Sequence, residues 1–204
     1  MNKVRIAILG CGGMARAHAH RFRHNKDVQI AALCDVSGPL LERFCKEHLG
    51  DYHPAPRLYT DAAAMYREAR PDAVAIVTPH TLHFEQGMQA LEAGCHVLME
   101  KPMVTSAQQA RKLAEKAKHS GKVFAIAYNT PCTPEFDFIR RTIRDRTLGR
   151  LELVSGYLCQ DWMKMTAGTW RQDPALSGGG QAYDSGAHLL NSVCWSVESD
   201  IAEV

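Results

Sequence analysis

An acid, a base and an imide, Glu100, Lys101 and Pro102, directly follow the apolar run "HVLM". A short apolar run bounded in this way is typical of a buried strand. A lysine at this point is often only the solvated end of a strand, but it can also deliver a charge to a ligand at the edge of a sheet. Lys101 is therefore the first candidate for a functional charge.

A second strand end also carries unusual residues. The run "AVAIV" is followed by Thr78 and Pro79, with His83 shortly beyond. Ligands of doubly wound sheets bind outside the carboxyl ends of the strands, so two such ends are expected in one cleft. We expect Thr78, Pro79 and His83 to contact a cofactor there, although a lone histidine is more often a surface residue.

The stretch "ILGCGGMARAH" places Gly10, Gly12 and Ala15 in the pattern G-x-G-x-x-G/A, between a strand and a helix. In a dinucleotide site the first glycine permits a tight turn and the second lets the backbone approach a pyrophosphate at the helix N-terminus. The alternative is a tight first turn with no ligand. We expect the loop to bind a dinucleotide through Gly10, Cys11, Gly12, Gly13 and Met14.

Asp35 ends the next apolar run, roughly 20 residues beyond the loop, where such sites place the carboxylate that binds the adenosine ribose. Val36 and Ser37 follow it, so no Arg or Lys stands ready for a 2′-phosphate. The sequence therefore favours NAD over NADP.

Apolar runs alternate with helical segments through residues 1–127. The runs are continuously apolar, as in parallel sheets covered on both faces, and this predicts a doubly wound α/β domain of the Rossmann type. Asp61 is a plausible helix N-cap, and Ser106 and Gln109 have capping-box spacing. The expected strands are 4–9, 28–34, 58–59, 73–77, 96–99 and 123–127, and the expected helices are 14–23, 39–47, 61–69, 82–92 and 106–121.

The pattern changes in residues 128–204. "TPEFDFIRRTIRD" predicts an amphipathic helix, and "LELVSGYLCQ" (151–160) a long strand. One strand and one or two helices cannot enclose a core of their own. We interpret residues 128–204 as the first part of a second domain whose remainder is absent.

Composition narrows the class of protein. The net charge is +2 and the pI about 8.2, which argues against nucleic acid or an acidic membrane as partner. Seven scattered cysteines without a C-x-x-C pair indicate no disulfide framework, no metal site and a reducing cytoplasm. We expect no signal peptide, and we find no apolar run of membrane-spanning length.

The motifs "GCGGMARAH", "VTPHTLH", "MEKP", "WRQDPALSGGG" and "DSGAH" occur in an order that resembles the Gfo/Idh/MocA oxidoreductases. The resemblance covers nearly the whole chain. It implies a Rossmann domain, then an α/β domain with a large, open and mostly antiparallel sheet through which full-length members form homo-oligomers. The implied reaction moves a hydride between a secondary alcohol of a sugar, inositol or similar polyol and nicotinamide.

The resemblance also implies roles for particular residues. Lys101 resembles the family's lysine beside nicotinamide and substrate, with Glu100 in its turn, while Asp184 and His188 match the catalytic dyad. The i, i+4 spacing of the dyad is expected to put both side chains on one helical face. His188 would take the substrate proton, which Asp184 would assist by orienting the ring.

Three further residues are implied to contact substrate or cofactor: Trp170, Arg171 and Asn129. Trp170 could equally pack between domains. Asn191 departs from the family, which often has Asp there, so the substrate stays open. Two other interpretations stay open. The protein could be a dinucleotide or sugar sensor that acts through a partner protein, or the 204-residue form could itself be inactive.

Overall fold

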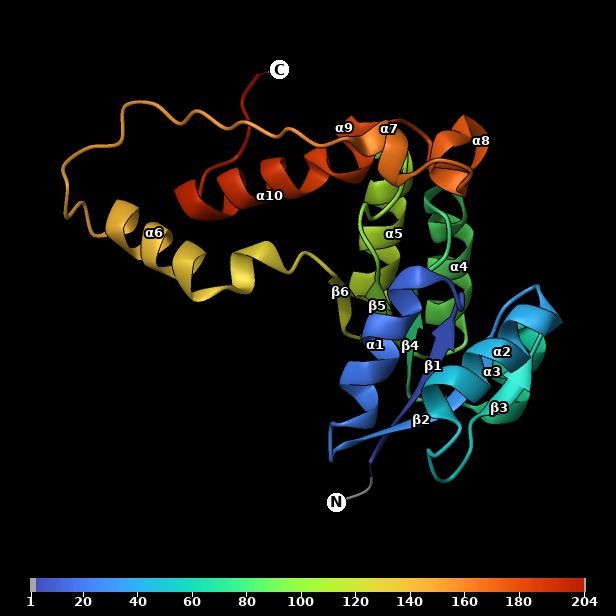
Figure 1. Cartoon of the computed structure of the whole chain (residues 1–204). Helices are drawn as coiled ribbons and strands as arrows, with labels where there is room; N and C mark the ends of the chain where they lie inside the picture. The colour runs from blue at the N-terminus through green and yellow to red at the C-terminus, as the bar shows by residue number, and fades with distance from the viewer. Residues whose placement is uncertain (1–2, 204) are drawn as a thin grey trace. The chain divides into compact units, whose positions relative to one another are not determined.

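The computed structural model describes residues 3–203, which form two compact units divided between Ile126 and Ala127 (Figure 1). Each unit is described by itself.

The first unit is built on a six-stranded parallel sheet in the order β3-β2-β1-β4-β5-β6. This is the doubly wound Rossmann order, so the fold expected from the sequence is confirmed. The strands are β1 (Val4–Leu9), β2 (Val28–Cys34), β3 (Arg57–Tyr59), β4 (Ala73–Ile76), β5 (His96–Met99) and β6 (Phe124–Ile126).

Helices cover both faces of this sheet (Figure 1). One buried cluster joins β1 and β2 to α1 and α2, and the other joins the opposite face of the strands to α3, α4 and α5. Both faces of each central strand are therefore apolar, which explains the unbroken apolar runs. The helices are α1 (Gly13–Arg23), α2 (Gly38–Leu49), α3 (Ala62–Ala69), η1 (His80–Leu82), α4 (His83–Glu92) and α5 (Ala107–Ser120).

Strands β1 and β4 lie side by side, and the chain leaves them toward opposite edges of the sheet. Such a switch point opens a crevice at the carboxyl ends of the strands, because the loops that follow diverge. The glycine loop follows β1, and Thr78 follows β4, so this crevice is the natural place for a ligand.

Of the two helix N-caps expected from the sequence, one is present in the structure and the other is not. The Asp61 carboxylate accepts a hydrogen bond from the Ala64 N–H at 2.7 Å, so the predicted cap of α3 is confirmed. Ser106 occupies the N-cap position of α5 without a side-chain cap hydrogen bond, so the capping box with Gln109 was wrong. Spacing alone does not fix the rotamer that a cap requires.

The second unit is helical. Helices α6 and α10 pack together, and Arg140 of α6 joins them by an ion pair with Glu198 (3.1 Å) and a cation–π contact with Trp195 (4.7 Å). The elements are η2 (Thr130–Cys132), α6 (Pro134–Arg144), α7 (Trp162–Met165), η3 (Trp170–Gln172), α8 (Pro174–Ser177), α9 (Gln181–Asp184) and α10 (Gly186–Val197).

The strand expected over 151–160 is wrong for this structure. The segment belongs to no helix or strand, and it pairs with no partner within residues 3–203. A strand needs a neighbour to satisfy its backbone hydrogen bonds, whatever the β propensity of its residues.

All seven cysteines are free, as the sequence indicated. Across the described part of the chain, none of the helices has the length and apolarity needed to cross a membrane.

Candidate functional site

The glycine loop makes a close turn after β1. Gly10 has φ +93°, and a Cβ there would stand 2.8 Å from the Val77 carbonyl oxygen, so only glycine fits. At Gly12 and Gly13 an added Cβ would meet nothing within 4 Å. No side chain caps the N-terminus of α1, whose N–H groups remain available to an anion.

Cys11 lies within this loop but is buried. Burial, with a smaller contribution from the charge of Asp35, raises the pKa of its thiol to about 12. The thiol therefore stays protonated and inert near neutral pH, and the residue contributes its backbone rather than a nucleophile.

Asp35 lies at the end of β2 and already holds the loop. Its carboxylate accepts hydrogen bonds from the Cys11 N–H (2.8 Å) and from the Ser37 N–H (2.9 Å). Ser37 in turn caps α2 by accepting from the Leu40 N–H. The carboxylate is half-buried and fixed between the loop and α2, next to the crevice.

The end of β4 differs from the expectation at one residue. Thr78 and Pro79 are half-buried, and the Thr78 hydroxyl hydrogen-bonds the side chain of Gln86. His83, expected at the cofactor, is instead 0% exposed, and its two ring nitrogens face the carbonyls of Thr78 and Pro102. Its partners are therefore the two strand-end turns.

The end of β5 places Lys101 at the same edge of the sheet as the glycine loop. The Glu100 carboxylate is bound by His18 of α1, with Nε2 and Oε1 2.7 Å apart, and by the Lys101 N–H at 3.3 Å. Burial raises the pKa of Glu100, but His18 and Lys101 together outweigh it and lower that pKa. His18 was not among the residues predicted from the sequence, where its only signal was a histidine on the buried side of the first helix.

In the second unit Asp184 lies at the centre of a buried cluster. Its Oδ2 accepts from the Trp162 indole N–H (3.0 Å) and from Arg171 Nε (3.1 Å). The Arg171 guanidinium stacks on Trp170 at 4.5 Å. Trp162 was not among the expected site residues, although a buried indole N–H usually has a hydrogen-bond acceptor.

Asp184 and His188 do not share one helix, although their i, i+4 spacing had predicted one. Asp184 ends α9, Ser185 intervenes, and His188 lies in the first turn of α10. The His188 ring is half-buried and packs edge-on against Tyr128, with centroids 5.9 Å apart.

Two other features of this unit are local. Asn129 is exposed and precedes η2. Among the three glycines before α9, Gly178 has φ +71°, and a Cβ at Gly179 would meet the Tyr183 ring at 2.4 Å. These glycines permit a tight backbone path.

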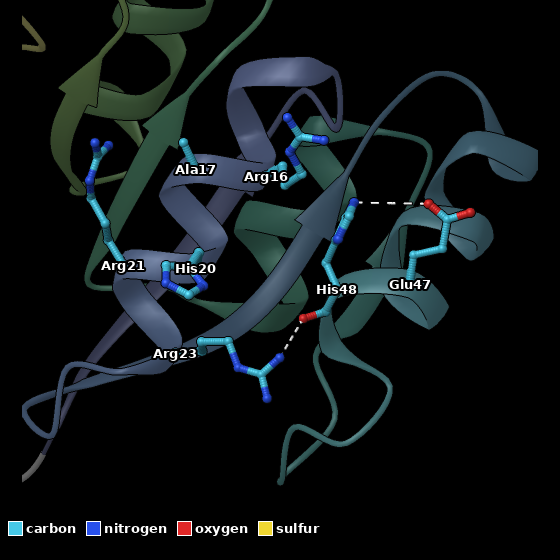
Figure 2. A pocket seen from close by; sticks show the side chains of 7 residues that line it. All are labelled: Arg16, Ala17, His20, Arg21, Arg23, Glu47 and His48. Carbon is cyan, nitrogen blue, oxygen red and sulfur yellow. Dashed lines mark hydrogen bonds and ion pairs between the residues drawn. The ribbon is translucent and has the colours of Figure 1, made fainter.

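A basic hollow lies between α1 and α2 (Figure 2). Helices of the sheet run antiparallel to its strands, so Arg23 and His48, near the two helix ends, lie toward the amino edge of the sheet. Arg23 donates to the His48 carbonyl at 2.8 Å. The lining residues of the hollow are Arg16, Ala17, His20, Arg21, Arg23, Glu47 and His48.

The first unit fits a dinucleotide. The space at Gly12 and Gly13, the uncapped N-terminus of α1 and the Asp35 carboxylate provide for a pyrophosphate and a ribose diol. In residues 3–203 the structure contains no cluster of His, Cys, Asp and Glu able to hold a metal ion.

Comparison with known families agrees with this geometry. Residues 4–128 match the family model described as "Oxidoreductase family, NAD-binding Rossmann fold". Residues 136–204 match the "GFO/IDH/MocA C-terminal domain".

Individual relatives cover nearly all of this chain. D-glucoside 3-dehydrogenase of Escherichia coli (strain K12) is 28% identical over 194 residues, 94% of this chain and 53% of that protein. Glucose-6-phosphate 3-dehydrogenase of Bacillus subtilis (strain 168) is 26% identical over 198 residues, which are 96% of this chain and 54% of that protein. The crystal structure of aldose-aldose oxidoreductase from Caulobacter crescentus, complexed with glycerol, has a TM-score of 0.81 at 25% identity, covering 98% of this chain and 59% of that one. This chain thus spans about half the length of these curated relatives.

Proposed function

The chain belongs to the Gfo/Idh/MocA oxidoreductase family, and we propose that it transfers a hydride between a secondary alcohol of a sugar, inositol or similar polyol and NAD. One observation carries the proposal. The open glycine loop, the Asp35 carboxylate and Lys101 gather at the carboxyl edge of one parallel sheet, beside its switch point.

In this proposal the first unit binds the cofactor. The N–H groups of residues 10–14 and the N-terminus of α1 bind the pyrophosphate, and Asp35 accepts from the adenosine ribose. Thr78, Pro79 and Asn129 border the nicotinamide. NAD, when bound, supplies the hydride acceptor. The absence of a basic residue directly after Asp35 is the reason to propose NAD rather than NADP.

The reacting alcohol must lose a proton as well as a hydride. His188 is proposed to take the hydroxyl proton, and Asp184 to orient His188. Lys101 is proposed to stabilise the developing alkoxide by its positive charge. Arg171 and Trp170 are proposed substrate contacts on the Asp184 side of the site.

Two relatives point to where a substrate search should begin. The names D-glucoside 3-dehydrogenase and glucose-6-phosphate 3-dehydrogenase both specify position 3 of a glucose unit. We therefore propose glucose derivatives with a free 3-hydroxyl as the first compounds to test, followed by inositols and amino sugars.

The decisive experiment follows reduced-cofactor absorbance with this panel, NAD and NADP, for the 204-residue chain and for any longer natural form. We expect turnover with NAD on at least one compound. Lys101→Ala and His188→Ala should each abolish turnover, and NADH binding, followed by fluorescence, should persist. His119→Ala, at an exposed position on α5, is the control. Near-native turnover in either variant would refute the assignment, and preference for NADP would refute the interpretation of Asp35.

Binding of NADH without turnover of any compound would favour the alternative, a dinucleotide sensor.

Seven free cysteines support a location in the reducing cytoplasm. A homo-oligomer of the full-length protein is the proposed state, because the family resemblance implies assembly through the second-domain sheet.

A further inference from the structure

The residues immediately before and after Lys101 are each held by a buried histidine. His18 lies on α1 and His83 on α4, and these helices pack on opposite faces of the sheet. His18 is 6% exposed and His83 0%. Neither histidine has a task in the reaction described above, yet both meet the three-residue turn that carries Lys101.

His18 holds the turn on the side of Glu100. Its Nε2 lies 2.7 Å from Glu100 Oε1, and the other carboxylate oxygen of Glu100 accepts from the Lys101 N–H. Because α1 begins at the glycine loop, this contact ties Lys101 to the helix that is proposed to bind the pyrophosphate. The two ends of the link are 82 residues apart in sequence.

His83 holds the turn on the side of Pro102. Its Nδ1 lies 2.9 Å from the Pro102 carbonyl oxygen, and its Nε2 lies 2.9 Å from the carbonyl oxygen of Thr78. Burial, the largest effect, lowers the pKa of His83 despite both carbonyls. A neutral ring has one N–H, so it donates to one of the two oxygens.

The proton of the neutral His83 ring is better placed on Nδ1, where it is donated to the Pro102 carbonyl oxygen. The Pro102 contact is fully buried, whereas the Thr78 contact is only partly buried. A buried carbonyl without a donor is more unfavourable than one that water can reach. The Nδ1–H tautomer of His83 therefore satisfies the acceptor that has no alternative.

We propose that His18 and His83 are positioning residues that hold Lys101 at the cofactor by fixing Glu100 and Pro102 from opposite faces of the sheet. The proposal rests on the role assigned to Lys101 in the proposed function. It predicts that substitutions of either histidine lower turnover, although neither histidine contacts the substrate.

Amide side chains can distinguish the two ring nitrogens. The amide nitrogen of Asn is as many bonds from Cβ as Nδ1 of His, and that of Gln as many as Nε2. His18 acts through Nε2, so His18→Gln should preserve the contact and His18→Asn should lose it. For His83 the order reverses: His83→Asn keeps the donor to Pro102, and His83→Gln loses it.

In turnover assays with the substrate found in the panel, the contact-losing variants should lower kcat by about 10²-fold, as expected for a displacement of a catalytic group by roughly 1 Å. Their KM and NADH dissociation constant should remain near native, and the contact-preserving variants should keep native kcat. His20→Asn is the matched control, since His20 is exposed on the same helix. Equal losses in the Asn and Gln variants of each histidine would overturn the proposal.

A second measurement does not depend on turnover. Hydrogen–deuterium exchange of the Lys101 and Met103 amides, without NAD, should be about tenfold faster in His18→Asn and His83→Gln, as expected when a hydrogen bond that limits local opening is removed. Native exchange in both variants would overturn the positioning role even if Lys101→Ala abolishes turnover. Faster exchange together with an active Lys101→Ala variant would refute the proposed function and leave the two histidines as anchors of the turn.

Discussion

Buried apolar side chains are distributed unevenly between the two units. Of the buried hydrophobic residues in the described part of the chain, all but Trp162 belong to the first unit. The second unit leaves large apolar side chains in solvent, among them Leu153 (82% exposed) and Phe138 (66%). The hydrophobic effect therefore stabilises the first unit far more, and the second depends on ion pairs, caps and a small buried polar cluster.

The largest difference between the units is expected when they are produced as separate fragments. We expect residues 1–126 to keep their far-ultraviolet circular dichroism and to unfold cooperatively, because two apolar layers enclose their sheet. Residues 127–204 should show no cooperative thermal transition. A sharp transition in the second fragment would contradict the comparison.

The next test replaces one leucine by alanine in each unit. Leu113→Ala removes a side chain that is 0% exposed and should lower the free energy of unfolding by about 2–5 kcal/mol. Leu153→Ala should change it by less than about 0.5 kcal/mol. Urea denaturation measures both, and equal effects would show that the exposed face is buried in solution.

Helix caps offer a finer comparison. Asp61 caps α3 in the first unit, and Asp173 caps the four-residue α8 in the second by accepting from the Ala175 N–H. Asp61→Ala should lower the free energy of unfolding by about 1 kcal/mol. Asp173→Ala should leave the main transition unchanged, and a comparable loss would show that α8 unfolds together with the sheet.

The last test concerns pH. The pKa of His83 is below its usual 6.5 in the folded chain, so the unfolded chain binds a proton first as the pH falls. The stabilisation is fully present above pH 6.5 and is lost below it, with a slope of at most about 1.4 kcal/mol per pH unit. His83→Asn should flatten this slope in denaturation curves recorded above and below that pH, while His20→Asn should not.

Local signals predicted the first unit well. Each correct prediction depends on a local property of the chain. Gly10 has a positive φ, and Asp61 caps an N–H group three residues along the chain. The unbroken apolar runs reflect strands that are buried on both faces. Requirements of this kind can be predicted without knowing the rest of the fold. The capping box at Ser106 failed because a correct spacing does not fix a rotamer.

Non-local requirements could not be predicted in this way. The strand expected at 151–160 lacks a pairing partner, which no property of its own residues reveals. The two backbone carbonyls that enclose the His83 ring could not be predicted from the residues around it. Nothing near Trp162 in the sequence announces Asp184 as its acceptor, because 22 residues separate them.

The doubly wound fold, the glycine loop and the candidate Lys101 could be predicted from the chain alone, since periodicity and motif spacing are local properties of a sequence. Asp184 and His188 became candidates through the family resemblance. The contacts that hold the Lys101 turn became visible only in the folded structure. His18 and Glu100 meet because α1 packs against the sheet beside the end of β5, and His83 reaches Pro102 because α4 lies on the other face. Contacts of that kind arise from the packing of elements that are distant in sequence.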